Sequence, residues 1–203
     1  VETLVKGLAR HPHVAVMSDE IYHRLLFDGR EHATLFRYPE LADRLIVLDG
    51  WSKTYAMTGW RLGWSVWPKS LVADAERLAI NCHSCVNASA QFAGVAALEG
   101  PQDSVEVMRK AFAERRRIIV DGLNALPGVR CVEPGGAFYA FPNIGGTKQE
   151  ARVLQDRFLN DAGVATIAGT AFGKHGEGYL RFSYANSAEN IREALRRIGQ
   201  VLA

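Results

Sequence analysis

Cysteine is scarce in this sequence, and long apolar runs are missing. The three cysteines, Cys82, Cys85 and Cys131, are an odd number, which argues against a disulfide framework and for a reducing, cytoplasmic location. Cys82 and Cys85 have the spacing of a redox or zinc motif, but no second such pair accompanies them. We therefore expect no metal site. No apolar run approaches the roughly 20 residues that a membrane span requires, and no signal-peptide pattern opens the chain.

The charge is nearly balanced. A formal net charge of +2 in 203 residues argues against nucleic acid or a membrane as the dominant partner. Hydrophobic residues make up 48% and charged residues 23%, as in an ordinary globular protein. The chain is long enough to form one large or two small domains. The chain begins inside a helix-like pattern, so we interpret it as a piece of a longer protein.

Three short apolar runs predict the strands of an α/β sheet. They cover residues 14–17, 45–48 and 62–67, and we expect the first to be a buried strand. Only about ten residues separate the second run from the third, whereas a parallel crossover needs a dozen or more. The first two strands should therefore be parallel and the third antiparallel to them.

Helical patterns follow the strands. They cover residues 69–80, 89–98 and 103–126, and the triplet Arg115 to Arg117 in the last of them is typical of a solvated face. We expect a change of domain near this helix, with one domain at 1–104 and a small α+β domain at 105–203. The second domain should hold a hairpin at 129–141, a helix at 149–162, a strand at 179–184 and a last helix.

The last helix carries a capping pattern and an apolar stripe. Asn186 and Glu189 have the spacing of a capping box. The positions that recur at helical spacing and should be buried are Ile191, Leu195, Ile198 and Leu202.

Several residues that could bind a ligand or react with it lie at one rim of the predicted sheet. An antiparallel third strand brings Lys53 and Arg61 together, and Asp19 lies at the carboxyl end of the first strand, where open α/β sheets bind ligands. Tyr22 follows on the same face of a turn. Each has an ordinary structural alternative: a solvated lysine, an arginine paired at a strand end, an aspartate that caps a turn and a core tyrosine.

Taken together, the four side chains suit a single ligand. A lysine beside a second cation has a lowered pKa and is a better nucleophile toward a carbonyl. Arginine binds phosphate in a bidentate manner, and a carboxylate can keep a ring nitrogen protonated. An aldehyde with a protonatable ring, a hydroxyl and a phosphate fits all four, and pyridoxal 5'-phosphate (PLP) is such a molecule.

The motifs resemble those of a known family. SDEIY (18–22), SKTYAMTGWRLGW (52–64) and YLRFSYA (179–185), supported by PGGAFY (134–139) and AGTAFG (168–173), are similar to the C-terminal signatures of fold-type I, class I/II aminotransferases. The resemblance implies that this chain is part of a mostly parallel, three-layer PLP-binding domain followed by a small α+β domain.

The same resemblance implies roles for individual residues. Lys53 would hold PLP as a Schiff base and move a proton at the substrate α-carbon, while Asp19 would pair with the ring nitrogen and Tyr22 with the ring oxygen. The remaining residues with an implied role are Arg61 and Ser52 at the phosphate, Arg181 at the substrate α-carboxylate, and Phe138 and Tyr139 on the substrate side.

The sequence also departs from the family pattern. Gly50 stands where some members have a phosphate-binding serine, Trp51 where phenylalanine is usual, and Ala168 where proline is common. Family members are longer, and their N-terminal half supplies a phosphate loop, an aromatic residue that stacks on the pyridine ring and an asparagine. None of these is found in this sequence.

The resemblance implies a homodimeric, PLP-dependent transaminase that acts on an amino acid and a 2-oxo acid. Three alternatives stay open: a PLP-dependent carbon-sulfur lyase, a non-catalytic aminotransferase-like regulator domain, and a fragment without activity of its own. The substrate is open too. No arginine lies between Leu78 and Met108, so the second arginine of one dicarboxylate-specific subgroup has no counterpart there.

Overall fold

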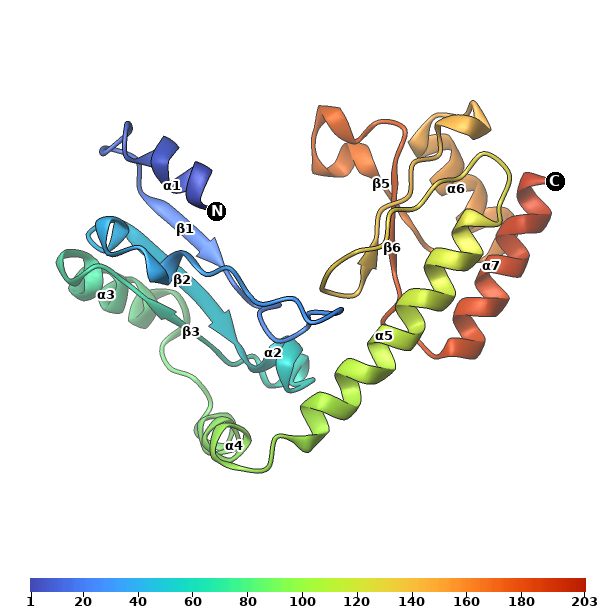
Figure 1. Cartoon of the computed structure of the whole chain (residues 1–203). Coiled ribbons are helices and arrows are strands. Elements are labelled where there is room, and N and C mark those ends of the chain that lie inside the picture. The colour runs from blue at the N-terminus through green and yellow to red at the C-terminus, as the bar shows by residue number, and fades with distance from the viewer. The chain divides into compact units, whose positions relative to one another are not determined.

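Three adjacent strands form the sheet of the first of two structural units (Figure 1). The computed structural model describes residues 1–203 and divides into unit 1, residues 1–106, and unit 2, residues 107–203. The strands of unit 1 are β1 (Val16–Asp19), β2 (Leu45–Gly50) and β3 (Gly63–Val66).

The directions of these strands agree with the sequence prediction. β1 and β2 are parallel, with Asp19 opposite Leu48, and β3 is antiparallel to β2, with Gly63 opposite Gly50. A short connection cannot carry a chain back to start a parallel strand. The end of β2 and the start of β3 therefore meet at one rim of the sheet.

The prediction of a buried first strand is wrong in position and in burial. β1 begins at Val16 rather than at Val14, and Met17 is 61% exposed. Burial alternates along β1, with Val16 and Ser18 half-buried and Met17 and Asp19 exposed, so only one face of the strand is covered. The buried run is in β2, where Leu45, Ile46 and Val47 are all in the core.

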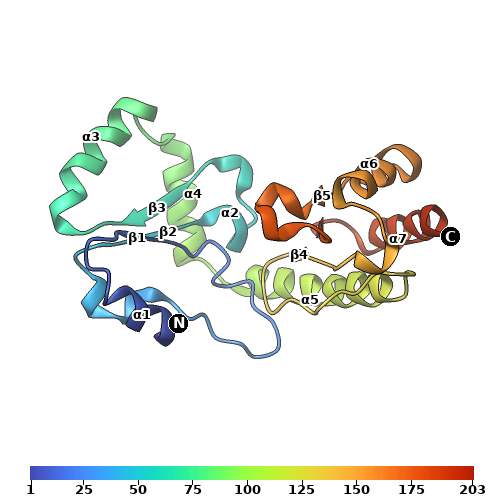
Figure 2. The same ribbon diagram turned by 90° about the horizontal axis from the view of Figure 1, so that it is seen from above.

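Helices lie on both sides of this sheet. Figure 2 shows α3 and α4 on one side and α1 on the other. A buried cluster that includes Val5 of α1 and Leu45 and Val47 of β2 fills the space on the α1 side. The helices of unit 1 are α1 (Glu2–Leu8), the single turn α2 (Trp51–Thr54), α3 (Val72–His83) and α4 (Ala88–Glu99).

Helix α5 (Asp103–Asn124) contains the arginine triplet, and the predicted solvated face is wrong for its middle member. Arg116 is only 6% exposed. Its guanidinium donates to the Pro134 carbonyl at 2.9 Å and lies 3.1 Å from a Glu133 carboxylate oxygen. Three successive helical residues point in three directions about 100° apart, so the triplet cannot share one face.

Unit 2 contains a second, antiparallel sheet with the order β4-β6-β5. The predicted hairpin at 129–141 does not form as two regular strands. The first half contributes one isolated bridge, from Arg130 to Asn143, and the second half pairs with β6. The strands are β4 (Tyr139–Ala140), β5 (Ile167–Ala168) and β6 (Leu180–Ser183).

Helices α6 (Ala151–Ala162) and α7 (Ala188–Leu202) complete unit 2. The predicted capping box at Asn186 is wrong by one residue: Ser187 is the N-cap of α7, and its hydroxyl accepts from the Asn190 amide at 3.1 Å. The predicted stripe is confirmed most clearly at Ile191 and Ile198, which are both buried. Neither unit contains a helix with the length and apolar character needed to span a membrane.

Candidate active site

Asp19 is the last residue of β1, and Tyr22 lies in the turn that follows. Asp19 Oδ1 accepts a hydrogen bond from the Ile21 amide at 3.2 Å, so the aspartate does cap this turn. The carboxylate is nevertheless exposed at the carboxyl end of the strand, where a ligand can reach it.

Lys53 lies in α2, which begins directly after β2 with no loop between them. The side chain is half-buried, and its Nζ atom lies 6.0 Å from the centroid of the Tyr22 ring. This distance is at the limit of a cation–π contact. The structure therefore brings the amine and the phenol together in unit 1, on one side of the sheet rim. Ser52, the residue before the lysine, is also half-buried.

Gly50 is the last residue of β2, directly before α2, and packing leaves no room for a side chain at this position. A Cβ built on Gly50 would lie 2.8 Å from Gly63 Cα and 2.9 Å from the Leu62 carbonyl oxygen. Both contacts are with backbone, which cannot rotate away. A serine here would require a backbone shift, which gives a physical reason for the departure from the family pattern at this position.

Trp51 has a hydrogen-bonding role that phenylalanine could not fill. Its indole Nε1 donates to the Gly94 carbonyl of α4 at 2.9 Å. A Cβ on Gly94 would come within 2.5 Å of a Leu62 side-chain carbon and 3.2 Å of the Trp51 ring. The tryptophan therefore ties the turn that carries Lys53 to helix α4.

Arg61 has a left-handed backbone conformation, with φ 53° and ψ 47°. Arg61 precedes the third strand, because β3 begins only at Gly63. Its Nη1 donates to the Thr58 carbonyl at 3.0 Å. The side chain is exposed and lines a hollow of unit 1 together with Trp60 and Asn87. A non-glycine residue in this conformation is uncommon and worth a functional explanation.

Two residues directly after Tyr22 were missed by the sequence reasoning. His23 Nδ1 lies 2.8 Å from Oδ2 of Asp49, the residue before Gly50. Arg24 Nη1 donates to Gln102 Oε1 at 2.7 Å and lies 3.4 Å from the Tyr55 hydroxyl. Adjacency to Tyr22 was the only available signal, because the partners are distant in the sequence.

A buried carboxylate, Glu20, organises the same turn. It accepts from the side chains of Ser18 at 3.1 Å and Thr34 at 2.9 Å, and lies 2.8 Å from His32 Nε2. Burial raises the pKa of Glu20, but the contacts with His32, Thr34 and Ser18 outweigh it, so the net pKa is lowered. Asp49 differs, because burial dominates there and its pKa is raised.

Arg181 and Tyr139 come together in unit 2. The Arg181 guanidinium carbon lies 4.5 Å from the centroid of the Tyr139 ring and 4.7 Å from that of Phe172, in the AGTAFG loop. Stacking of this kind orients the planar guanidinium and suits it to bind a carboxylate at its edge.

The backbone before Tyr139 is held by Tyr184. Ala137 has a left-handed conformation with φ 60°. The buried Tyr184 hydroxyl donates to the Ala137 carbonyl at 3.0 Å, and the Tyr184 amide donates to the Phe138 carbonyl at 2.9 Å. Burial raises the pKa of Tyr184 well above its ordinary value, so the hydroxyl keeps its proton and remains a donor. Phe138 stacks on Phe112 with centroids 5.4 Å apart.

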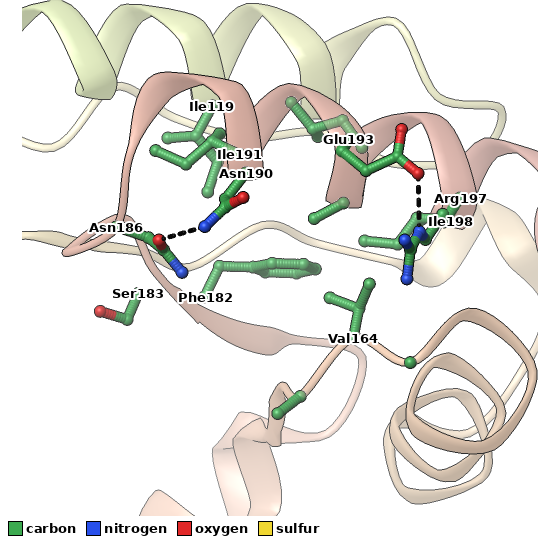
Figure 3. A pocket seen from close by; sticks show the side chains of 14 residues that line it. Ile119, Val164, Phe182, Ser183, Asn186, Asn190, Ile191, Glu193, Arg197 and Ile198 are labelled. Carbon is green, nitrogen blue, oxygen red and sulfur yellow. Dashed lines mark hydrogen bonds and ion pairs between the residues drawn. The ribbon is translucent and has the colours of Figure 1, made fainter.

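A separate pocket of unit 2, about 340 Å³ in volume, lies beside α7 (Figure 3). Its lining includes Phe182, Ile198 and the Glu193–Arg197 pair, whose charged groups lie 2.8 Å apart. None of the eight residues that the sequence analysis assigned a role in the site lines it. We therefore keep it apart from the candidate active site.

An open α/β sheet with an amine and a phenol at its carboxyl rim is typical of α/β proteins, in which this rim is where small ligands bind. The chain belongs to the family described as aminotransferase class I and II, whose model matches residues 1–198.

Named relatives agree with this assignment. The chain is 38% identical to an aspartate aminotransferase of Pyrococcus horikoshii over 98% of its own length and 51% of the relative. It is 40% identical to an arginine–pyruvate transaminase of Pseudomonas aeruginosa, over 90% of this chain and 46% of that one. A solved aromatic aminotransferase of Pyrococcus horikoshii matches with a TM-score of 0.94 and 35% identity, over 99% of this chain and 54% of that one. The chain thus spans about half the length of these relatives.

Members of this family use pyridoxal phosphate, and the groups in unit 1 fit it. The cofactor presents an aldehyde, a ring nitrogen, a ring hydroxyl and a phosphate. Unit 1 offers the half-buried Lys53 amine beside the Tyr22 ring, the Asp19 carboxylate at a strand end and the exposed Arg61 guanidinium. These four groups are of the chemical kinds that such a cofactor requires.

Proposed function

We propose that this chain is the lysine-bearing part of a PLP-dependent aminotransferase, which moves an amino group between an amino acid and a 2-oxo acid. The observation that carries the proposal is the approach of Lys53 Nζ to the Tyr22 ring, 6.0 Å from its centroid. In a family of aminotransferases, an amine held beside a phenol at a sheet rim is suited to bind the cofactor aldehyde.

Each residue of unit 1 has a distinct task in this proposal. Lys53 binds the aldehyde covalently and, as a free amine, carries a proton to and from the substrate α-carbon. Asp19 keeps the ring nitrogen protonated, Tyr22 donates to the ring oxygen, and Arg61 with Ser52 holds the phosphate. When bound, PLP supplies an electron sink that stabilises negative charge at the α-carbon.

Unit 2 contributes substrate binding. The stacked guanidinium of Arg181 binds the α-carboxylate, and Tyr139, whose ring lies 4.5 Å from it, lines the substrate side. Relatives of similar identity are named for aspartate and for arginine. Because those side chains carry opposite charges, identity alone supports no particular amino acid.

We also propose that the protein is a homodimer located in the cytoplasm. Dimerisation follows from the resemblance to class I/II aminotransferases. The location is supported by three cysteines in 203 residues, two of them exposed, since free exposed thiols suit a reducing compartment.

Covalent trapping tests the proposal. The protein expressed from its complete gene is mixed with PLP, reduced with borohydride and digested, and the peptides are analysed by mass spectrometry. We expect a pyridoxyl group on Lys53 and none in Lys53→Ala. Lys69→Ala, which removes an exposed lysine of unit 1, should label like the wild type. A label elsewhere, or none, would overturn the proposal.

Product analysis separates the proposed reaction from the lyase alternative. A transaminase given an amino acid without a 2-oxo acid should accumulate pyridoxamine phosphate in stoichiometric amount. Release of pyruvate and ammonia would instead indicate a carbon-sulfur lyase. Running the same assays on residues 1–203 alone tests whether this part of the protein is active by itself.

A further inference from the structure

Two consecutive residues after Tyr22 are each tied to a residue that flanks Lys53. His23 contacts Asp49, on the N-terminal side of the lysine, and Arg24 contacts Tyr55, on its C-terminal side. We propose that His23 and Arg24 are positioning residues, which together fix the Tyr22 phenol relative to the Lys53 amine. The contacts hold whatever the protein does, while their consequence for a cofactor rests on the proposed function.

Local structure alone cannot fix this relationship. Tyr22 lies in a turn closed by the His23 amide to the Glu20 carbonyl, 2.9 Å, and by the Leu25 amide to the Tyr22 carbonyl, 2.9 Å. Lys53 lies in α2, a single helical turn of four residues. One turn of helix is unstable by itself in water. Strand pairing places the starts of both segments, since the Glu20 amide donates to the Leu48 carbonyl at 2.8 Å. The side-chain contacts of His23 and Arg24 restrain the segments beyond the strand ends.

The first arm is the contact between His23 and Asp49. The Asp49 side chain is 6% exposed, and its Oδ1 accepts from the Gly50 amide at 2.6 Å, which aligns it with the start of α2. The approach of His23 Nδ1 to Oδ2 is short but is not aligned as a hydrogen bond.

The second arm joins Arg24 to Tyr55 through Gln102. The amide oxygen of Gln102 accepts from Arg24 Nη1 at 2.7 Å and from the Tyr55 hydroxyl at 3.1 Å. The Gln102 nitrogen donates to the carbonyls of Ala97 at 2.9 Å and Gly100 at 2.8 Å. All of these groups lie in unit 1, and the glutamine is anchored by backbone on its far side.

The test uses the protein from its complete gene, with the variants His23→Ala, His23→Asn, Arg24→Met and Arg24→Lys. Asparagine at position 23 keeps a nitrogen near Nδ1, and lysine at position 24 keeps the charge. The matched controls are His13→Ala and Arg37→Ala, which remove exposed residues of the same types from unit 1. Two measurements are made on each protein.

The first measurement is hydrogen exchange of backbone amides without cofactor. We expect the amides of Leu25 and Tyr55, which close the two turns, to exchange about tenfold faster in His23→Ala and Arg24→Met. Asparagine and lysine should restore part of the protection, and the controls should match the wild type. Unchanged exchange at both turns in both variants would overturn the proposal, whether or not PLP binds.

The second measurement is the pH titration of the absorbance of bound PLP. A phenol that donates a hydrogen bond to the ring oxygen of PLP stabilises negative charge on that oxygen. When the phenol is misplaced, the nitrogen that joins Lys53 to PLP keeps its proton up to a higher pH. We expect the midpoint to rise by about one unit in His23→Ala and Arg24→Met. If both variants bind PLP as the wild type does and their midpoints are unchanged, the proposal is also overturned. Failure of the wild type to bind PLP would instead refute the proposed function and leave the exchange result to decide.

Discussion

Gly50 and Gly63 face each other across the β2–β3 pair so closely that a Cβ on Gly50 would lie 2.8 Å from Gly63 Cα. The contact sets the path of the chain from the sheet into the turn that holds Lys53. It is made by backbone on both strands. The sheet rim therefore depends on a residue with no side chain.

Gly50→Ser should destabilise unit 1. Overpacking of this kind costs about 1 to 3 kcal/mol, and the free energy of unfolding in urea measures it. All four tryptophans lie between residues 51 and 67, so their fluorescence reports on unit 1. Gly59→Ala is the control, because nothing lies within 4 Å of a Cβ there. Equal stability of Gly50→Ser and the wild type would contradict the predicted clash.

Arg61→Gly should separate stability from cofactor binding. Glycine adopts the left-handed conformation of Arg61 at φ 53° without strain, so the unfolding free energy should hold or rise by up to about 1 kcal/mol. Loss of the guanidinium should weaken PLP binding about 10- to 100-fold, as expected for a charged hydrogen bond. Equilibrium binding measures this, with Arg77→Ala, an exposed arginine of α3, as control. Unchanged affinity would argue against a phosphate role.

Glu20 should make unit 1 more stable at neutral than at acid pH. Its folded pKa is lowered from 4.5, so its contribution is complete above that value and is lost as the pH falls through the folded pKa. Glu20→Gln should lower the unfolding free energy at pH 7 by about 1 to 3 kcal/mol. The difference from the wild type should shrink as the pH falls below 4.5.

The control for that prediction is Asp49→Asn. Its difference in unfolding free energy from the wild type should change with pH in the opposite direction. Because burial raises the folded pKa of Asp49, its ionised form is disfavoured in the native state. The stability that comes from the protonated form is present at low pH and is lost as the pH rises through the folded pKa. A pH-independent gap between Glu20→Gln and the wild type would show that the charge of Glu20 is not responsible.

Arg181→Lys should raise the KM for amino acids. Lysine keeps the charge but lacks the planar fork that stacks near Tyr139 and Phe172 and binds a carboxylate through two bonds. We expect a rise of about 10- to 100-fold, with a smaller change in kcat, because ground-state and transition-state binding are lost together. Arg192→Ala, an exposed residue of α7, should leave the kinetics unchanged. A kcat that falls without a change in KM would contradict a binding role.

Much of unit 1 was predictable from short-range patterns. The apolar run 45–48 marked the central strand, and the short connection to the third run fixed its direction. These inferences succeed because burial and chain length act locally. The roles of Asp19, Tyr22, Lys53 and Arg61 stay predictions.

The contacts that depend on distant partners were not predictable. Arg24 meets Gln102, 78 positions away, and no pattern around either residue announces the pair. Arg116 was assigned to solvent because charge triplets usually are, yet its partners Glu133 and Pro134 lie beyond the end of its helix. The cap of α7 was misplaced by one residue because Asn186 and Ser187 are both good cap residues.

The corner before Tyr139 has a consequence for how variants of unit 2 should behave. Ala137 is held in a left-handed conformation, which costs about 1 to 2 kcal/mol for a residue with a Cβ. The two hydrogen bonds from Tyr184 oppose that cost. When these hydrogen bonds are lost, we expect the strained turn at Ala137 to relax completely to an unstrained conformation. Tyr139 should therefore lose its place beside Arg181 in an all-or-none manner, and intermediate phenotypes at Tyr184 should reflect mixtures of two conformations.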